Sequence, residues 1–281
     1  MPVNDELGKR MKEFYEQIPK TKLMRRTPVI IRIDGKAFHT FTRGFKRPID
    51  EILIKTMQET TKYLCENIQG CVLGYTQSDE ITLVLVDYQK LNSDAWFGYE
   101  VQKMCSIAAS MATLAFNDSF GFNVARYLDS LSETELDNQD EYISVLCRAM
   151  RKGAMFDARV FNIPKKEVTN CLYWIQLDAT RNSIQMVGQA NFSHKELHKK
   201  TCNAIQDMLM TQKGINWNDF PTYQKRGTCV IKEEYYPEPV KGYEDCEVNA
   251  LDVRTRWIID KDIPIFKGEG REYIEKLITF E

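Results

Sequence analysis

The segment from Cys71 to Asp87 constrains the fold most, because two apolar runs are separated there by only five polar residues. The runs CVLGY (71–75) and ITLVLVD (81–87) are short and rich in β-branched residues, which is typical of buried strands. The intervening TQSDE has the length of a hairpin loop, so we expect an antiparallel pair. Ser78 and Asp79 then lie at or beside the hairpin tip.

Two more strands and two helices are predicted around this hairpin. The run PVIIRI (28–33) has the composition of a buried strand, and AMFDARVFNIP (154–164) alternates as a strand that ends at its last proline. Apolar residues at steps of three and four predict helices over 53–68 and 94–117. The order strand, helix, strand, strand, helix, strand is the split βαβ arrangement of ferredoxin-like folds, and the fold class is therefore α+β.

That topology places two carboxylates side by side. The strands 28–33 and 81–87 become the central pair, and the hairpin tip lies near the end of the first strand. Asp34 follows that strand directly and opens the turn signal Asp34-Gly35, while Asp79 lies at the tip. We therefore expect Asp34 and Asp79 to be neighbours.

The remainder of the chain is less informative. The acidic stretch 129–141 is expected to be an exposed connection, since it holds six acidic residues and no basic one. Helical patterns cover about 165–180 and 195–210, and a basic strand is predicted at 224–232. The stretch from Glu233 onward is expected to add strands or a packed tail.

Composition indicates a globular protein with its own core. Hydrophobic residues make up 43% of the chain and charged residues 28%, so disorder is excluded as the default state. No apolar run approaches the roughly 20 residues that span a bilayer, and the start of the chain is polar. We expect no membrane segment and a cytoplasmic location. The eight cysteines show no ligand spacing and are expected to be reduced core residues.

Charge is unevenly distributed although the net charge is only −2. From Lys9 to Arg47 there are twelve Lys and Arg against three acidic residues, which makes a local cationic surface available to phosphates. An ordinary solvated face explains this pattern equally well. His194 and His198 are four residues apart and could ligate a metal, but with three lysines nearby a solvated or RNA-facing surface is the favoured interpretation.

The pair Asp34 and Asp79 is the candidate chemical centre. Two hard-oxygen ligands brought together suit a pair of Mg²⁺ ions, which can activate an attacking hydroxyl and stabilise a leaving pyrophosphate. Without further evidence, an aspartate at a turn more often serves only to stabilise the turn through hydrogen bonds to the backbone. In RIDGKAFH (32–39), however, a glycine and successive amides follow the carboxylate, where a triphosphate can be held, and Ser78 and Glu80 flank Asp79. Lys36, Lys46 and Arg47 are within reach of negative charge. Two ordinary explanations also exist: Lys46-Arg47-Pro48 is compatible with a basic loop before a helix, and Glu80 with a solvated strand residue.

At the level of whole motifs, RIDGKAFHTFTRGFKRP and GYTQSDEITLVL resemble the signature segments of the tRNA(His) guanylyltransferase family, the 3′-to-5′ RNA polymerases. The later FDARVFNIP and FPTYQKRGTCVIK resemble that family's C-terminal module, so the resemblance covers about residues 5–232. It implies a polymerase palm-like catalytic domain over 1–135 with its last core strand at about 154–163. A C-terminal α/β module over 139–232 and an extension over 233–281 complete the implied division.

The resemblance also implies roles for individual residues. Asp34, Asp79 and Glu80 would be catalytic, with two Mg²⁺ held by Asp34, the carbonyl of Gly35 and Asp79. The residues that would contact nucleotide phosphates are Lys36, Ala37, Phe38, His39, Ser78, Lys46 and Arg47. The residues that would contact RNA are Arg25, Arg26, Arg32 and Asn182.

The family adds nucleotides to the 5′ end of tRNA, using ATP to activate a 5′-monophosphate before the 3′-hydroxyl of the incoming nucleotide attacks. Members that add the obligatory guanosine to tRNA(His) carry His-Ile-Asn-Asn after a Gln and an Asp. In this chain Gln176 and Asp178 are present, but the four positions read Thr180-Arg181-Asn182-Ser183. The chain therefore resembles the guanylyltransferase-like branch, whose members resemble template-dependent polymerases that repair 5′-truncated tRNA.

Substrates and partners follow from the resemblance in the same way: tRNA, ATP, GTP and other nucleoside triphosphates, and a homotetramer. Three other functions stay open at this point. They are obligatory guanosine addition to tRNA(His), a palm-type nucleotide cyclase that shares paired carboxylates, and a non-catalytic RNA-binding module that uses the basic N-terminal face. The last is the least favoured, because carboxylates facing bound phosphates would repel them.

Overall fold

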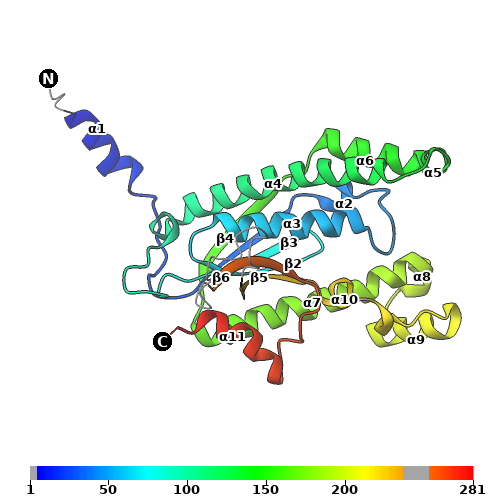
Figure 1. The fold of residues 1–281 in the computed structure, drawn as a ribbon. Helices are drawn as coiled ribbons and strands as arrows, with labels where there is room; N and C mark the ends of the chain where they lie inside the picture. Colours follow the sequence, from blue (N-terminus) through cyan, green and yellow to red (C-terminus); the bar gives the residue numbers. More distant parts are fainter. Residues whose placement is uncertain (1–4, 237–252, 281) are drawn as a thin grey trace, which may run out of the picture.

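The structure is a computed structural model that describes residues 5–236 and 253–280. One six-stranded antiparallel sheet in the order β4-β1-β3-β2-β5-β6 forms its centre, with helices on both faces (Figure 1). The strands are β1 Val29–Gly35, β2 Cys71–Gln77, β3 Glu80–Leu85, β4 Phe156–Asn162, β5 Thr228–Tyr235 and β6 Arg254–Asp260.

Four of these strands make the predicted split βαβ unit. In chain order it comprises β1, α3 (Glu51–Asn67), β2, β3, α4 (Val101–Asp129) and β4, and β1 pairs with β3 in the middle. The register pairs Asp34 with Glu80, and the tip between β2 and β3 is the two residues Ser78 and Asp79. The predicted hairpin, the central strand pair and the approach of Asp34 to the tip are confirmed.

One face of the sheet is covered by α3 and α4. Helix α3 begins at its cap Asp50, whose carboxylate accepts a hydrogen bond from the Leu53 amide at 3.1 Å. Buried side chains of α3 and α4 then meet the inward residues of β1 and β3, and the shared core includes Ile31, Ile33, Met57, Leu64, Leu83, Met104, Ala108 and Phe116. Burial of this apolar surface holds the carboxylate-bearing strands in place.

The opposite face is covered by α7 (Val168–Asn191) and α11 (Glu272–Ile278), as Figure 1 shows. Ile30 and Val84 pack there against Leu172, Ile175 and Phe266. Gln176 is buried in this layer: its amide donates to the Pro264 carbonyl at 2.9 Å and its oxygen accepts from the Phe266 amide at 3.0 Å. The tail thus packs under the sheet, as expected, and β6 adds the strand expected beyond Glu233.

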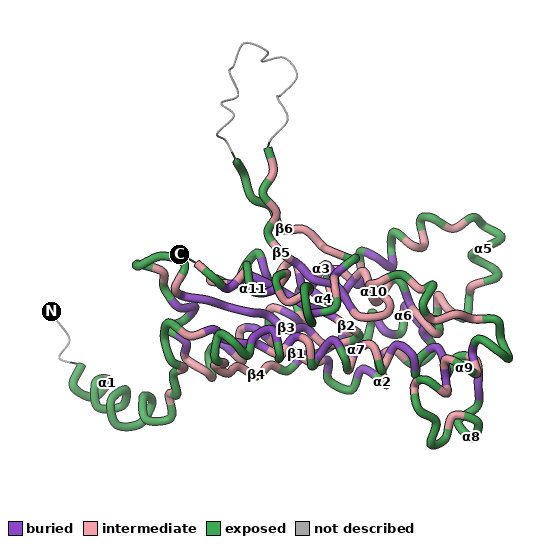
Figure 2. Tube along the Cα trace, turned by 90° about the horizontal axis from the view of Figure 1, so that it is seen from below, coloured by how far each residue is buried: buried purple, intermediate pink, exposed green. Residues whose placement is uncertain are grey.

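A third, smaller core lies at the far end of α7, where α8 (His194–Leu197) and α9 (Cys202–Lys213) fold back (Figure 1). Ile184, Val187, Phe192, Ile205 and Leu209 form it. The remaining elements are α1 (Glu6–Met11), η1 (Lys12–Glu16), α2 (Phe38–Phe41), η2 (Trp96–Tyr99), α5 (Glu133–Asn138), α6 (Asp140–Lys152), η3 (Lys165–Glu167), η4 (Trp217–Asp219), α10 (Thr222–Arg226) and η5 (Gly268–Arg271). Of these, α1 and η1 bury no residue and stand away from the sheet (Figure 2).

Several expected boundaries were wrong. The stretch 129–141 is exposed but largely helical rather than a plain connection, because Ser132 and Glu135 form a capping box that starts α5. Helix α7 continues well beyond residue 180, to Asn191. The strand predicted at 224–232 begins only at Thr228, since α10 occupies the preceding residues and ends at Gly227, whose φ of +85° favours glycine.

Other expectations concern membranes, cysteines and domains. In the described ranges, no helix is both long and apolar enough to cross a membrane. The seven cysteines located there are free, and Cys246 lies outside the described residues. The division of the chain at 1–135, 139–232 and 233–281 stays a prediction, although β5 and β6 continue the sheet of the first segment.

Candidate active site

Asp34 and Asp79 come together at one end of the sheet. The amide of Gly35 donates to the Asp79 carbonyl at 3.1 Å, which ties the end of β1 to the hairpin tip. Both aspartates line a cleft of about 530 Å³, a volume typical of a small-molecule site. The other lining residues are Gly35, Ala37, Phe38, His39, Thr42, Phe45, Lys46, Arg47, Pro48, Asp50, Leu53, Ser78, Met186 and Gln189.

The hairpin tip holds Asp79 in a defined position. Ser78 adopts a left-handed conformation with φ 54°, which lets a two-residue tip close the hairpin. Its hydroxyl donates to Asp79 Oδ1 at 2.9 Å. Burial raises the pKa of the Asp79 carboxyl, and the nearby charges of Asp34 and Glu80 raise it further. Asp34 lies 3.6 Å from the Arg159 guanidinium and Glu80 lies 2.5 Å from Arg32, whereas no ion pair of Asp79 is found among the described residues.

The raised pKa of Asp79 predicts a pH-dependent gain in stability for Asp79→Asn. A carboxyl whose pKa is higher in the folded than in the unfolded protein destabilises the fold at neutral pH, and the penalty disappears as pH falls through the folded pKa. In metal-free buffer, the variant should therefore resist urea better than the parent at pH 7, and the difference should shrink as pH falls toward 4. A gain of equal size at both pH values would show that the buried charge of Asp79 is not its cause.

The donor set fits Mg²⁺. Two aspartates and the Gly35 carbonyl are hard oxygen ligands, and Mg²⁺ takes few carboxylates from proteins and completes its shell with phosphate oxygens and water. The structure contains, within residues 5–236 and 253–280, no group of three or more His, Cys, Asp or Glu with metal-binding geometry. The carboxylate pair suits an ion that is shared with a bound phosphate.

The loop after Gly35 is anchored by aromatic packing. A Cβ on Gly35 would lie 2.2 Å from the Phe38 ring, so this ring packs directly on the glycine backbone. Phe38 also contacts Phe41, Phe116 and Phe156 at centroid distances of 5.1, 5.5 and 5.2 Å. The Phe38 side chain is therefore buried, and the predicted phosphate contact of this residue would be made by its backbone.

That backbone offers free donors. Ala37 has a left-handed φ of 53° and caps α2. In the part of the chain that the structure describes, the amides of residues 37–39 have no hydrogen-bond acceptor. Three successive N–H groups at a turn are an anion-binding arrangement. Ala37 and His39 line the cleft, whereas the exposed Lys36 does not.

Lys46 and Arg47 both line the cleft but differ in what they contact. The Lys46 ammonium donates to the Tyr127 hydroxyl at 3.1 Å and lies 4.4 Å from the ring centroid of Tyr142. Tyr142 in turn donates to Asp50 at 2.7 Å. Lys46 is thus held between α4 and α6, whereas no ion pair of Arg47 occurs among the described residues. Arg47 is the freer cation beside the carboxylates.

The structure does not bring the four predicted RNA-binding residues into this cleft. Arg32 pairs with Glu80 at 2.5 Å and lies over the ring of Trp174, on the face covered by α7. Asn182 donates to Asp178 within α7 at 3.0 Å. Glu80 is accordingly committed to Arg32 and is absent from the cleft lining.

Arg25 and Arg26 lie at the opposite end of β1 from Asp34. Arg25 donates to Asp87 at 2.6 Å, and the Arg26 amide donates to the same carboxylate at 2.9 Å. Their local role is to fasten the chain before β1 to the end of β3. RNA binding by these residues stays a prediction.

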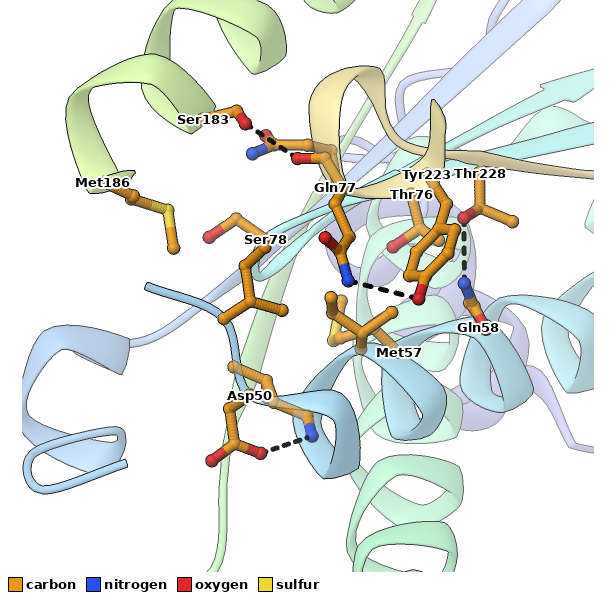
Figure 3. Close-up of a pocket in the computed structure, with 14 residues that line it drawn as sticks. Asp50, Met57, Gln58, Thr76, Gln77, Ser78, Ser183, Met186, Tyr223 and Thr228 are labelled. Carbon is orange, nitrogen blue, oxygen red and sulfur yellow. Dashed lines mark hydrogen bonds between the residues drawn. The ribbon is translucent and has the colours of Figure 1, made fainter. Parts of the chain in front are cut away.

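Seven residues of the cleft lining were not predicted as site residues: Thr42, Phe45, Pro48, Asp50, Leu53, Met186 and Gln189. Asp50 is the N-cap of α3. Met186 and Gln189 belong to α7, which is far from the other lining residues in sequence. A smaller pocket adjoins the cleft and shares Asp50, Leu53, Ser78 and Met186 with it. Figure 3 shows Ser183 and Met186 reaching this pocket from α7, opposite Met57 and Gln58 of α3. Ser183 is the last of the four positions where guanosine-adding members carry His-Ile-Asn-Asn. This position therefore lies beside the candidate site.

Fold and cleft together define a mixed α/β protein whose antiparallel sheet presents two carboxylates and free amides to a nucleotide-sized cleft. The family described as tRNAHis guanylyltransferase matches residues 8–164, more than half of the chain, and the chain belongs to this family. Its members are nucleotidyltransferases, so the protein is an enzyme that acts in tRNA processing. The expected family is confirmed.

Relatives with solved structures extend over nearly the whole chain. A bacterial tRNA(His) guanylyltransferase-like protein in complex with ATP is 40% identical with a TM-score of 0.78, covering 98% of this chain and 100% of that one. A structure of the same description with GTP is 38% identical with a TM-score of 0.71, covering 98% and 99%. The tRNA(His) guanylyltransferase of Schizosaccharomyces pombe is 26% identical over 241 residues, 81% of this chain and 82% of the relative.

Proposed function

We propose that the protein adds nucleotides in the 3′-to-5′ direction to the 5′ end of tRNA, and that its main reaction is template-dependent repair of 5′-truncated tRNA. The observation that carries the proposal is the convergence of Asp34, Asp79 and the free amides of residues 37–39 on one cleft. Solved structures of bacterial guanylyltransferase-like proteins in complex with ATP and with GTP support the two nucleotide substrates. The βαββαβ order with central β1 and β3 supports a palm-like catalytic domain.

Asp34, Asp79 and the Gly35 carbonyl would hold two Mg²⁺, which would lower the pKa of the attacking hydroxyl and neutralise charge on the leaving pyrophosphate. The amides of residues 37–39 would bind triphosphate oxygens, with Ser78 and the Arg47 guanidinium beside them. ATP would first adenylylate a 5′-monophosphate end, releasing pyrophosphate. The 3′-hydroxyl of the incoming nucleotide would then attack the activated 5′ phosphorus and displace AMP.

Obligatory guanosine addition to tRNA(His) is the second candidate function. It is favoured by the name shared by the family and by curated relatives such as the Schizosaccharomyces pombe enzyme. Against it stands the α7 segment Thr180-Arg181-Asn182-Ser183, in which Ser183 lines the pocket beside the cleft and accepts a hydrogen bond from Trp217 at 3.1 Å. This segment supports the repair branch.

A direct comparison of two RNA substrates tests the proposal. With Mg²⁺, ATP and the four nucleoside triphosphates, we expect faster extension of a 5′-truncated tRNA opposite its template base than addition of guanosine to full-length tRNA(His). The ratio of kcat/KM values measures the preference. A ratio that favours full-length tRNA(His) would move the protein to the second function, and no 5′ extension of either RNA by folded protein would reject both.

The tetramer belongs to the same proposal and rests on the resemblance to the family. The cytoplasmic location is proposed as the sequence led us to expect it. In a tetramer, RNA would cross from one subunit to another. Sedimentation of the protein with and without tRNA measures the assembly.

A further inference from the structure

A second cavity of about 510 Å³ lies next to the cleft. The two cavities share Arg47 and Gln189, so they are continuous at their rims. The remaining lining residues are Gln185, Phe192, His194, Leu197, His198, Lys199, Lys200 and Ile205. None of the residues other than Arg47 and Gln189 belongs to the candidate active site.

The cavity is formed by the segment after α7, which reverses direction between α8 and α9 and packs on the third hydrophobic core. After α7 ends, Ser193 caps α8 by accepting a hydrogen bond from the Glu196 amide at 3.4 Å. Lys199 then takes a left-handed φ of 60°, which reverses the chain before Thr201 caps α9. Phe192 and Ile205 belong to the third hydrophobic core beneath. The basic segment is therefore held by structure and is not a free tail.

Charge in the cavity has one sign. Arg47, Lys199 and Lys200 are cationic, two imidazoles can donate hydrogen bonds, and the lining includes no carboxylate. The nearby carboxylate of Glu196 is occupied, since it accepts from the Ser193 amide at 2.8 Å and from its hydroxyl at 2.6 Å. No ion pair of Lys199 or Lys200 is found across residues 5–236 and 253–280. A concave, unpaired basic surface attracts phosphate.

We propose that this cavity binds backbone phosphates of the RNA strand whose end enters the cleft. The proposal rests on the proposed function, because it assumes that RNA is the substrate there. A free nucleoside triphosphate is the less suitable ligand, since the cavity has no carboxylate to share the Mg²⁺ that accompanies it. The amides of Gln185 and Gln189 can meet ribose hydroxyls or base edges, which a nucleotide chain presents beside its phosphates.

The double substitution Lys199→Asn and Lys200→Gln tests this assignment. Asn tolerates the left-handed conformation of Lys199, so both charges are removed without adding backbone strain. We expect the Kd for tRNA to rise about tenfold at fixed salt, and the slope of log K against log salt to fall by about 1.4 for two lost phosphate contacts. The KM values for ATP and GTP should stay within about twofold of those of the parent protein.

The matched control is Lys165→Asn with Lys166→Gln, which removes an adjacent exposed lysine pair in η3, just before α7 and outside the cavity lining. We expect this variant to bind tRNA like the parent. The pair His194→Gln and His198→Gln serves as a second cavity variant if the first has a lowered melting temperature, and it should also weaken tRNA binding.

Two results would overturn the proposal. One is unchanged tRNA affinity and salt slope in both cavity variants. The other is a raised KM for ATP or GTP, or a raised inhibition constant for pyrophosphate, with tRNA binding intact, which would assign the cavity to a free phosphate ligand. Binding is measured without turnover. Lost tRNA affinity in the cavity variants would therefore support phosphate binding by the cavity even if the parent protein extended no RNA.

Discussion

Replacing Asp34 with Asn is expected to reduce nucleotide addition by about 10³-fold while leaving tRNA affinity within about twofold. The amide keeps the size of the side chain and its place at the end of β1, but it removes one of the two carboxylates that line the cleft. A metal ion contributes several kcal/mol of charge stabilisation in such reactions, and a neutral ligand binds it poorly. Single-turnover extension at saturating tRNA measures the chemical step, and filter binding measures the affinity.

Asp157 provides a matched control for this prediction. It is the register partner of Asp34 on β4, yet its side chain is 59% exposed, pairs with Arg159 at 3.4 Å and is absent from the cleft lining. Asp157→Asn should change turnover by less than about threefold, because exposed ion pairs contribute little. Equal losses in the two variants would show that general charge at this sheet end, not the cleft carboxylate, supports the reaction.

The parts of the site that could be predicted from sequence are those fixed by local strand geometry. Two apolar runs with a five-residue polar spacer allow little except a hairpin, and the split βαβ order then places its tip beside Asp34. The side-chain period of two in a strand fixes the rest, since Ile31 and Ile33 must face the core beneath α3 and α4. Local pattern and sheet topology agree at this end of the sheet, which is why the carboxylate pair can be predicted.

The contacts that the sequence does not predict involve residues whose partners come from distant parts of the chain. Lys46 is predicted to contact phosphate, and this stays a prediction. Its aromatic partners Tyr127 and Tyr142 lie on helices roughly eighty and a hundred residues later. Gln176 matches the family pattern before the four-residue motif, and its hydrogen bonds to the backbone of Pro264 and Phe266 are about ninety residues distant in sequence. Such pairings depend on tertiary packing, which no local pattern reports.

The same reason explains why the far wall of the cleft is not predictable from sequence. Met186 and Gln189 are ordinary residues of a helical pattern, and only the packing of α7 across the end of the sheet brings them to Asp34. The basic cavity formed by the segment after α7 is a related case. The charge pattern around His194 and His198 favours a solvated or RNA-facing surface, and the structure adds that they line a concave site continuous with the cleft.

Gly35→Ala is expected to damage both stability and activity, because the loop beside Asp34 has no room for a methyl group. The added Cβ would lie 2.2 Å from the Phe38 ring, which is itself packed among Phe41, Phe116 and Phe156. Overpacking of this kind costs about 1–3 kcal/mol of unfolding free energy. A shift of about 1 Å in the reacting groups can lower the rate about 10²-fold. Urea denaturation and single-turnover extension measure the two effects.

A double-mutant cycle identifies the Phe38 ring as the cause. Phe38→Leu alone should cost about 1 kcal/mol by leaving a small cavity, but it opens space where the new methyl group must go. The double variant should then be more stable than the sum of the single effects predicts, by about 0.5–3 kcal/mol. Gly121→Ala in α4 is the control, since its Cβ would meet only Met150 at 3.8 Å, and it should be neutral or stabilising. Additive losses in the cycle would place the strain of Gly35→Ala in the backbone and not in the contact with Phe38.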